Sequence, residues 1–257
     1  MKSILKADLS RAFKNWKFPL AVFLMFLVWE LNSKRFEQKE DVLYLFINVW
    51  GRSITYLMAI LISSIPFLSA HMEEKENHFL RYSILRTWVK KYVCSKLVVS
   101  FLSAFSICVL GTLVFLLKEM CLIPFVAQES FTIENFAPMS CLSDLMIKHT
   151  GLVVAIQTVL YGVLCGVMCV LSMTFSTYIH QSLGIYMIPF LLYYCFYYIF
   201  AGFFQNYPML CIESVYECMH CYTKDPVIFF SYACFATICL GSFGGILMYR
   251  KVKGEFQ

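Results

Sequence analysis

The chain has 257 residues, of which 60% are hydrophobic and 14% are charged, and its formal net charge is +5. Soluble domains have about a quarter of their residues charged, so this composition excludes an ordinary soluble protein and predicts a membrane protein. Enrichment of Lys and Arg in the segments on one side of the membrane accounts for the positive net charge. We therefore expect no nucleic-acid partner.

The N-terminal segment combines basic and apolar positions. Residues 1–17, MKSILKADLSRAFKNWK, predict an amphipathic helix that precedes the first apolar stretch. That stretch, residues 18–31, has the length of a signal-peptide core, but no small-residue cleavage pattern follows it. We therefore expect an uncleaved membrane anchor.

Six apolar stretches approach or reach the roughly 20 residues that a helix needs to cross a hydrocarbon core about 30 Å thick. They are residues 18–31, 54–70, 97–117, 152–173, 183–203 and 227–248. None shows the strict alternation of a membrane β-barrel strand. The predicted fold class is therefore an all-α polytopic membrane protein, with six transmembrane helices in one domain over residues 1–257.

Residues 43–50, LYLFINVW, immediately precede the second stretch. Joining the two would give a helix of about 42 Å at 1.5 Å per residue, which is too long to cross simply. The segment is predicted to be interfacial or re-entrant.

Lys and Arg residues set the expected orientation, because cytoplasmic segments of membrane proteins are enriched in them. Most of the 21 lie before the first stretch, between the second and third, or after the sixth. Both termini and residues 71–96 are therefore predicted to be cytoplasmic. The longer segments 118–150 and 205–226 are predicted to be external.

The second external segment is rich in cysteine. Its CxxC motif at 218–221 has the spacing of two zinc ligands. The segment has no second CxxC or HxxxH pair to complete a tetrahedral set, so no metal site is predicted. On the external side a disulfide among Cys211, Cys218 and Cys221 is the simpler expectation. Unpaired thiols and a metal ion remain the other interpretations.

Two further features each allow two interpretations. Gly162 with Gly166, and Gly241 with Gly245, have GxxxG spacing, which favours internal helix packing over a dimer contact. Arg52 either lines a polar cavity for an anionic group or extends to the lipid headgroups.

Catalytic motifs are absent from the sequence. It contains no GxxxxGK[ST] phosphate-binding loop, no HExxH and no GxSxG. We expect no catalytic residues, no cofactor and no enzymatic activity in this chain itself.

Residues 71–96 interrupt two apolar stretches with many charges. Three carboxylates would stand in the first turn of a helix over residues 73–85, where they complement its dipole, and an aromatic stripe follows. Thr87 is the predicted N-cap of a second helix that leads into the third span. A helix resting on anionic headgroups is the alternative, but such lipids would repel the acidic start.

The layout of six spans, the amphipathic start and the acidic-then-basic segment before KYVCSKLV resembles the permease subunits of ABC-2 type transporters. The pattern of that family is matched by Glu74, Glu76, Arg86, Tyr92 and Lys96. The resemblance implies that the segment couples the membrane part to a separate ATP-hydrolysing subunit. The coupling residues would be Glu73, Glu74, Glu76, Phe79, Arg81, Tyr82, Arg86 and Lys96.

The resemblance also implies an exporter in a bacterial plasma membrane, with a second permease copy or a homologous permease and two ATPase subunits. Nothing in the sequence selects a substrate. The alternative is a non-transporting immunity or sensor protein that binds a ligand through its external segments.

Overall fold

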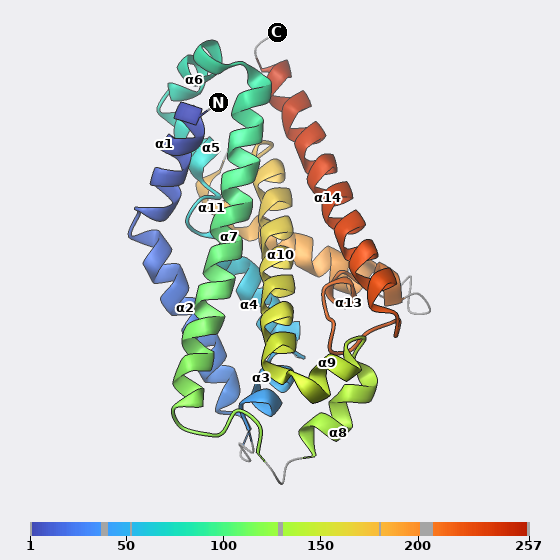
Figure 1. The fold of residues 1–257 in the computed structure, drawn as a ribbon. Coiled ribbons are helices and arrows are strands. Elements are labelled where there is room, and N and C mark those ends of the chain that lie inside the picture. Colours follow the sequence, from blue (N-terminus) through green and yellow to red (C-terminus); the bar gives the residue numbers. More distant parts are fainter. Residues whose placement is uncertain are drawn as a thin grey trace.

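The computed structural model describes residues 2–36, 41–51, 53–127, 131–179, 181–200 and 208–255, and within these ranges the regular elements are all helices. Figure 1 shows an elongated bundle. Its first half contains α1 (Lys2–Phe13), α2 (Lys17–Ser33), α3 (Val42–Trp50), α4 (Ser53–Ser64), α5 (Ala70–Glu76), α6 (Phe79–Thr87) and α7 (Val89–Met120). Its second half contains α8 (Thr132–Phe136), η1 (Ala137–Met139), α9 (Ser143–Lys148), α10 (Thr150–Ser176), α11 (Ser182–Tyr194), η2 (Cys195–Phe200), η3 (Pro208–Leu210), α13 (Ile212–Val215) and α14 (Pro226–Gly254).

Three helices, α7, α10 and α14, are each long and apolar enough to cross a membrane. The count rises to five if the bent pairs Ile4–Phe13 with Lys17–Ser33 and Val42–Trp50 with Ile54–Ser64 each form one span. The all-helical, multi-pass character is therefore confirmed for the described residues. Six spans and the cytoplasmic position of both termini stay predictions.

The second predicted stretch, residues 54–70, is not one helix. Helix α4 ends at Ser64, and turns follow up to Ser69. Pro66 explains the early end, since proline lacks an N–H and disfavours helical backbone at the residue before it.

Helix α3 is enclosed by the bundle. Trp29 of α2 stacks on Phe46 of α3 and on Phe115 of α7, while Trp50 of α3 stacks on Tyr161 of α10 at 3.7 Å between ring centroids. Seven of the nine residues of α3 are buried, and α3 bends by 82° from α4. A buried, sharply bent segment fits a broken span or a re-entrant loop, and both interpretations of residues 43–50 stay predictions.

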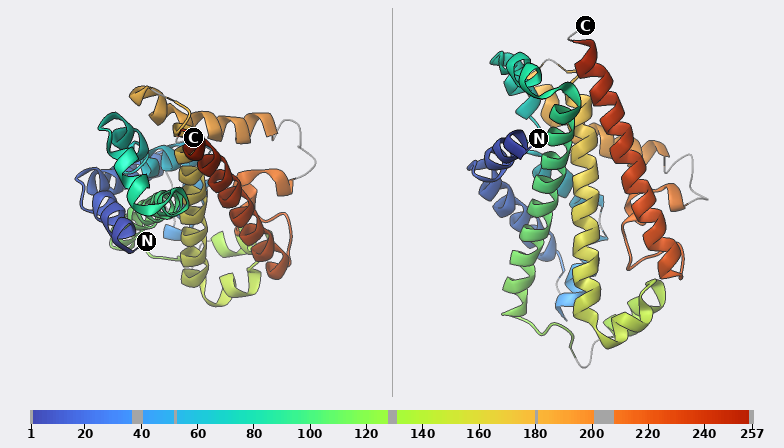
Figure 2. Two further views of the ribbon diagram at one scale, coloured as in Figure 1. Left: turned by 90° about the horizontal axis from the view of Figure 1, so that it is seen from above. Right: turned by 45° about the horizontal axis from the view of Figure 1, so that its top comes forward.

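The long helices α7 and α10 pack along each other in both views of the bundle (Figure 2). At Gly162 and Gly166 an added Cβ would lie 2.8 Å from Phe105 and 2.6 Å from Phe101, both on α7. Internal packing is thus confirmed for this GxxxG pair. In α14 an added Cβ at Gly241 would meet nothing within 4 Å.

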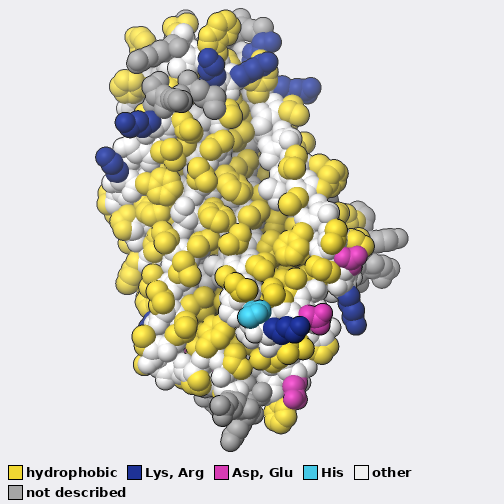
Figure 3. Space-filling view, in the orientation of Figure 1, with side chains coloured by type: hydrophobic (Ala, Val, Ile, Leu, Met, Phe, Trp, Pro, Cys, Tyr) yellow, Lys and Arg dark blue, Asp and Glu magenta, His cyan; other side chains and the backbone are white. Residues whose placement is uncertain are grey.

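The two ends of the bundle differ. Both chain termini lie at one end, together with α5 and α6, and we call this the basic end (Figure 1). On the face drawn in Figure 3, most Lys and Arg side chains gather at this end and hydrophobic side chains cover the middle. We call the opposite end, which contains α8, η1 and α9, the loop end. The termini therefore share a side, as the predicted topology requires.

Candidate functional site

The segment predicted to couple to an ATPase forms a helical hairpin. Helix α5 ends at Glu76, and His78 has a left-handed backbone with φ 58° before α6 begins. The expected single helix over residues 73–85 is therefore wrong, and the carboxylates belong to α5 rather than to the first turn of the aromatic helix.

The expected N-cap at Thr87 is also wrong. Thr87 lies in the last turn of α6, where its hydroxyl donates to the Ser83 carbonyl, and the break falls at Trp88 with φ 69°. A side chain that bonds the carbonyl four residues back continues a helix instead of starting one.

A buried lysine connects three elements at the basic end. Lys96 of α7 is 1% exposed, and its Nζ lies 2.8 Å from Asp8 Oδ1 of α1 and also pairs with Glu74 of α5. Ser95 Oγ donates to Asp8 Oδ2 at 2.7 Å. A charge taken out of water is tolerated only when it is paired and hydrogen-bonded, and each of these buried groups meets that condition.

Arg11 of α1 extends the network. It pairs with both Glu73 and Glu74, and Lys17 Nζ lies 3.6 Å from Glu73 Oε1. Burial opposes ionisation of Glu73, but hydrogen bonds from Ser69 and Arg11 hold its pKa below the usual value. Two of the three predicted coupling carboxylates therefore bind α1 and α7.

His71 closes the network on the inner side. Tyr92 Oη donates to Glu74 Oε2 at 2.8 Å and lies 3.0 Å from His71 Nδ1. Because the tyrosine hydrogen is directed to the carboxylate, Nδ1–H of histidine is the donor in the second contact. Burial lowers the pKa of His71 to about 4, so the ring is neutral at pH 7. We call His71, Tyr92, Asp8, Arg11, Glu73, Glu74 and Lys96 the ion network.

The outer face of α6 carries large apolar side chains that contact little else. Its inner face, with Leu80 and Ile84, packs against α7 and the C-terminal part of α14. We call the outer set the α6 surface: Phe79, Tyr82, Leu85 and Trp88, with exposed fractions of 63%, 72%, 77% and 77%. Soluble surfaces rarely gather such side chains without a partner or a membrane against them.

A groove adjoins the α6 surface. It has a volume of about 540 Å³ and is lined by Trp88, Val89, Lys90, Lys91, Tyr249 and Lys253. Glu76 is exposed at the end of α5. The side chains of Arg81 and Arg86 lie outside the described part of the structure. Of the predicted coupling residues, the structure thus joins Glu73, Glu74 and Lys96 in the ion network and exposes Phe79, Tyr82 and Glu76.

Sequence reasoning missed Asp8, Arg11 and His71. All three belong to the ion network, and each lies far along the chain from its partners. One signal was present for Asp8, since it shares a helix face with Leu5, Leu9 and Ala12, and an acidic residue on a packed face needs a cation.

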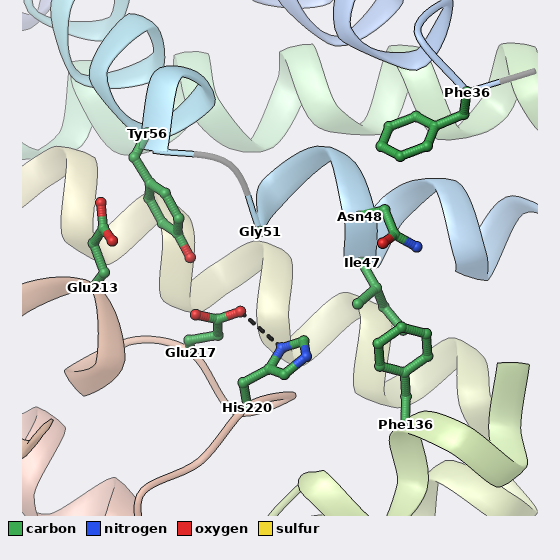
Figure 4. Close-up of a pocket in the computed structure, with 9 residues that line it drawn as sticks. All are labelled: Phe36, Ile47, Asn48, Gly51, Tyr56, Phe136, Glu213, Glu217 and His220. Carbon is green, nitrogen blue, oxygen red and sulfur yellow. Dashed lines mark hydrogen bonds and ion pairs between the residues drawn. The ribbon is translucent and has the colours of Figure 1, made fainter.

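A second polar site is a cleft of about 430 Å³ between α3, α4, α8 and the segment around α13 (Figure 4). Its lining residues are Phe36, Ile47, Asn48, Gly51, Tyr56, Phe136, Glu213, Glu217 and His220. Arg52, predicted either to line a polar cavity or to reach the headgroups, lies outside the described residues, next to Gly51.

Three ionisable residues of the cleft are Glu213, Glu217 and His220. Glu217 Oε1 lies 3.0 Å from His220 Nδ1, and this hydrogen bond raises the pKa of His220. Burial raises the pKa of Glu213 to about 7, and this carboxyl also accepts a hydrogen bond from Tyr193 Oη. Glu213 therefore changes its charge near neutral pH. The sequence pattern IESVYE, with two glutamates four apart, was the available signal.

Three cysteines of residues 205–226 lie beside this cleft. No disulfide joins Cys211, Cys218 or Cys221 in the structure, and burial raises the pKa of Cys218. Among the described residues, no group of three or more His, Cys, Asp or Glu is placed to hold a metal ion.

Comparison of the chain with protein-family models, with curated proteins and with solved structures finds no match.

Proposed function

We propose that the chain is the membrane-spanning permease subunit of an ATP-driven exporter in a bacterial plasma membrane. It would work with a separate ATP-hydrolysing subunit that docks on the α6 surface. The observation that supports this proposal best is an exposed aromatic surface on the short helix α6, which follows directly on α5, together with the ion network that joins α5 to α1 and α7.

The ion network suits the transmission of a movement. Removing one partner of a buried ion pair costs about 3–5 kcal/mol, so α5, α1 and α7 resist separation. A force applied to α6 through the hairpin would reach α7, one of the three helices long enough to cross the membrane. A helix that only rests on lipid has no need of such a connection.

The α6 surface has the anatomy of a docking site. Phe79, Tyr82 and Trp88 are the types of side chain that act as anchors in protein interfaces, and Glu76, Lys90 and Lys91 supply a charged rim of both signs. ATP binding and hydrolysis in the partner would then move this chain and a second permease copy or homologue, and open a shared path alternately to each side of the membrane.

The test is purification in detergent from the native membrane, with mass spectrometry of the proteins that co-purify. The wild-type chain should bring a soluble protein bearing GxxxxGK[ST] in fixed ratio. The double variant Phe79→Ala/Tyr82→Ala should lower that ratio roughly tenfold or more, since anchor truncations typically cost 2 kcal/mol or more.

Leu117→Ala is the matched control, because Leu117 is 64% exposed near the far end of α7. It should leave the ratio unchanged. An unchanged ratio for the double variant would end the docking proposal. If the double variant also bound anionic vesicles more weakly than the wild-type chain, the α6 surface would be a lipid contact.

A second candidate function is a non-transporting membrane protein that binds a ligand at the loop end. The cleft favours it, because its lining includes the carboxyl groups of Glu213 and Glu217, which suit an amine-bearing or otherwise cationic ligand. A chain that purifies without any ATPase would support this candidate over the first.

A further inference from the structure

Two segments that are far apart in the sequence run side by side near the loop-end cleft. The Cys141 N–H donates to the Cys218 carbonyl at 3.3 Å, and the Cys221 N–H donates to the Met139 carbonyl at 3.1 Å. Ser140 Oγ also donates to the Cys218 carbonyl, at 2.9 Å. These bonds hold the segment after α8 against the segment before α14.

Two thiols converge between these segments. Cys221 Sγ lies 3.0 Å from the Cys218 carbonyl oxygen, and Cys141 Sγ lies 3.7 Å from the same oxygen. The side chains of Cys141 and Cys221 are also within hydrogen-bond reach of each other. The backbone of Cys141 bonds that of Cys218, and the backbone of Cys221 bonds that of Met139, so the two thiols meet diagonally between the paired segments. A disulfide requires Cβ atoms about 3.5–4.5 Å apart.

Cys218 is the less suitable partner, although it completes the CxxC motif. Its side chain is fully buried, and its N–H donates to Gln157 Oε1 of α10 at 2.7 Å, which fixes it against the bundle. Cys221 is partly exposed, so an oxidant reaches it first.

We propose that Cys141 and Cys221 form a disulfide that joins the two external segments, an inference that rests on the predicted external position of the loop end. The bond would fix one wall of the cleft. Phe136 and His220, which both line the cleft, lie a few residues from the two cysteines and contact each other at 5.6 Å between ring centroids.

The chemistry is thiol–disulfide exchange with a disulfide-bearing oxidant, either a small-molecule disulfide or an oxidoreductase. The Cys221 thiol loses its proton to solvent and attacks the oxidant, whose S–S bond breaks and releases one thiol. Cys141 then attacks the sulfur of Cys221 as a thiolate and displaces the second oxidant thiol. Two thiols of the chain are oxidised, and one disulfide of the oxidant is reduced to two thiols.

The test is disulfide mapping by mass spectrometry on the full chain, alkylated in intact cells before purification and without reductant. We expect a linked peptide pair containing Cys141 and Cys221. Cys141→Ser and Cys221→Ser should each abolish it and leave the remaining thiol open to alkylation, whereas Cys218→Ser should preserve it. A linked pair containing Cys218 and Cys221, or free thiols that react with a membrane-impermeant maleimide from outside, would overturn the proposal.

Maleimide labelling before and after the cells are opened tests separately on which side of the membrane the loop end lies. If the impermeant maleimide reaches these thiols only after the cells are opened, the loop end is not external and the disulfide proposal fails together with the topology. The geometry alone can then be checked on detergent-purified chain with oxidised glutathione, where formation of a different pair would show that the side-by-side arrangement is wrong as well.

Discussion

A single side chain, Lys96, determines how the basic end is held together. A lysine at the entrance of a span would ordinarily extend to the headgroups, but this one is 1% exposed and lies between two carboxylates. Its ring contacts, at 5.4 Å to Phe67 and 5.3 Å to Tyr92, also exclude water from the ammonium group. The position could be predicted as important from the resemblance, but its partner Asp8 could not, because no local pattern links residues in α1 and α7.

Replacing Lys96 with Met tests this role. The variant removes the cation beside buried Asp8 and leaves Glu74 paired with Arg11, so we expect a loss of about 3 kcal/mol in the free energy of unfolding, measured by thermal or chemical unfolding in detergent. Lys90→Met is the control, since Lys90 is exposed on the same helix, and it should change stability little.

A double variant shows whether the loss comes from the pairing. Asp8→Asn combined with Lys96→Met removes the stranded charge and should recover part of the stability lost in Lys96→Met. Equal stability of wild type and Lys96→Met would mean that the ion network contributes nothing to holding α1, α5 and α7 together.

At the scale of elements, glycines leave room for neighbouring side chains where α7 and α10 pack together. Helices in a membrane gain little from the hydrophobic effect between them and pack through small residues instead. Gly166 meets this description, because the Phe101 ring occupies the place of a side chain, whereas Gly241 has an equally suitable spacing but no neighbour within 4 Å.

The two glycines form a matched pair for a stability test. Gly166→Ala forces the Phe101 ring or the helices to shift and should cost about 1–3 kcal/mol. Gly241→Ala should be neutral or stabilising by up to about 1 kcal/mol, because alanine is the better helix former. The measurement is the free energy of unfolding of both variants in the same detergent. Equal stability of Gly166→Ala and Gly241→Ala would show that the α7–α10 contact is looser than described.

The elements also show what the sequence can and cannot predict. Long apolar helices such as α7 and α10 were predictable, because twenty apolar residues leave few alternatives. The hairpin break at His78 could not be predicted, because positive φ is uncommon for non-glycine residues and the sequence there contains no glycine or proline. The end of α4 was predictable from Pro66 and was overlooked because the apolar run continues past it.

At the scale of the molecule, α14 lies at the periphery of the bundle (Figures 1 and 2). Only 17% of its apolar window is buried, against 78% for α10. Its outer side chains include Phe235, Ile238, Phe243 and Ile246, which are 53% to 66% exposed. So large an apolar face needs either lipid or another protein against it, and the proposed second permease is the occupant that an exporter requires.

Cross-linking distinguishes lipid from a second copy on α14. In a chain whose exposed cysteines at 94, 121, 234 and 239 are replaced by Ser, Ile238→Cys places a thiol on the same helix face as Gly241. If two copies meet there, oxidation in the native membrane should yield a covalent dimer at this position and not with Leu117→Cys on α7. A lipid-covered α14 would yield no dimer from either variant, because thiols separated by lipid meet only by collision. Gly241 permits close approach of backbones. If the contact between two copies lies at Gly241, the variant Gly241→Leu should weaken the cross-link at position 238. Random encounters would not respond to this variant, so the response distinguishes them from a packed interface.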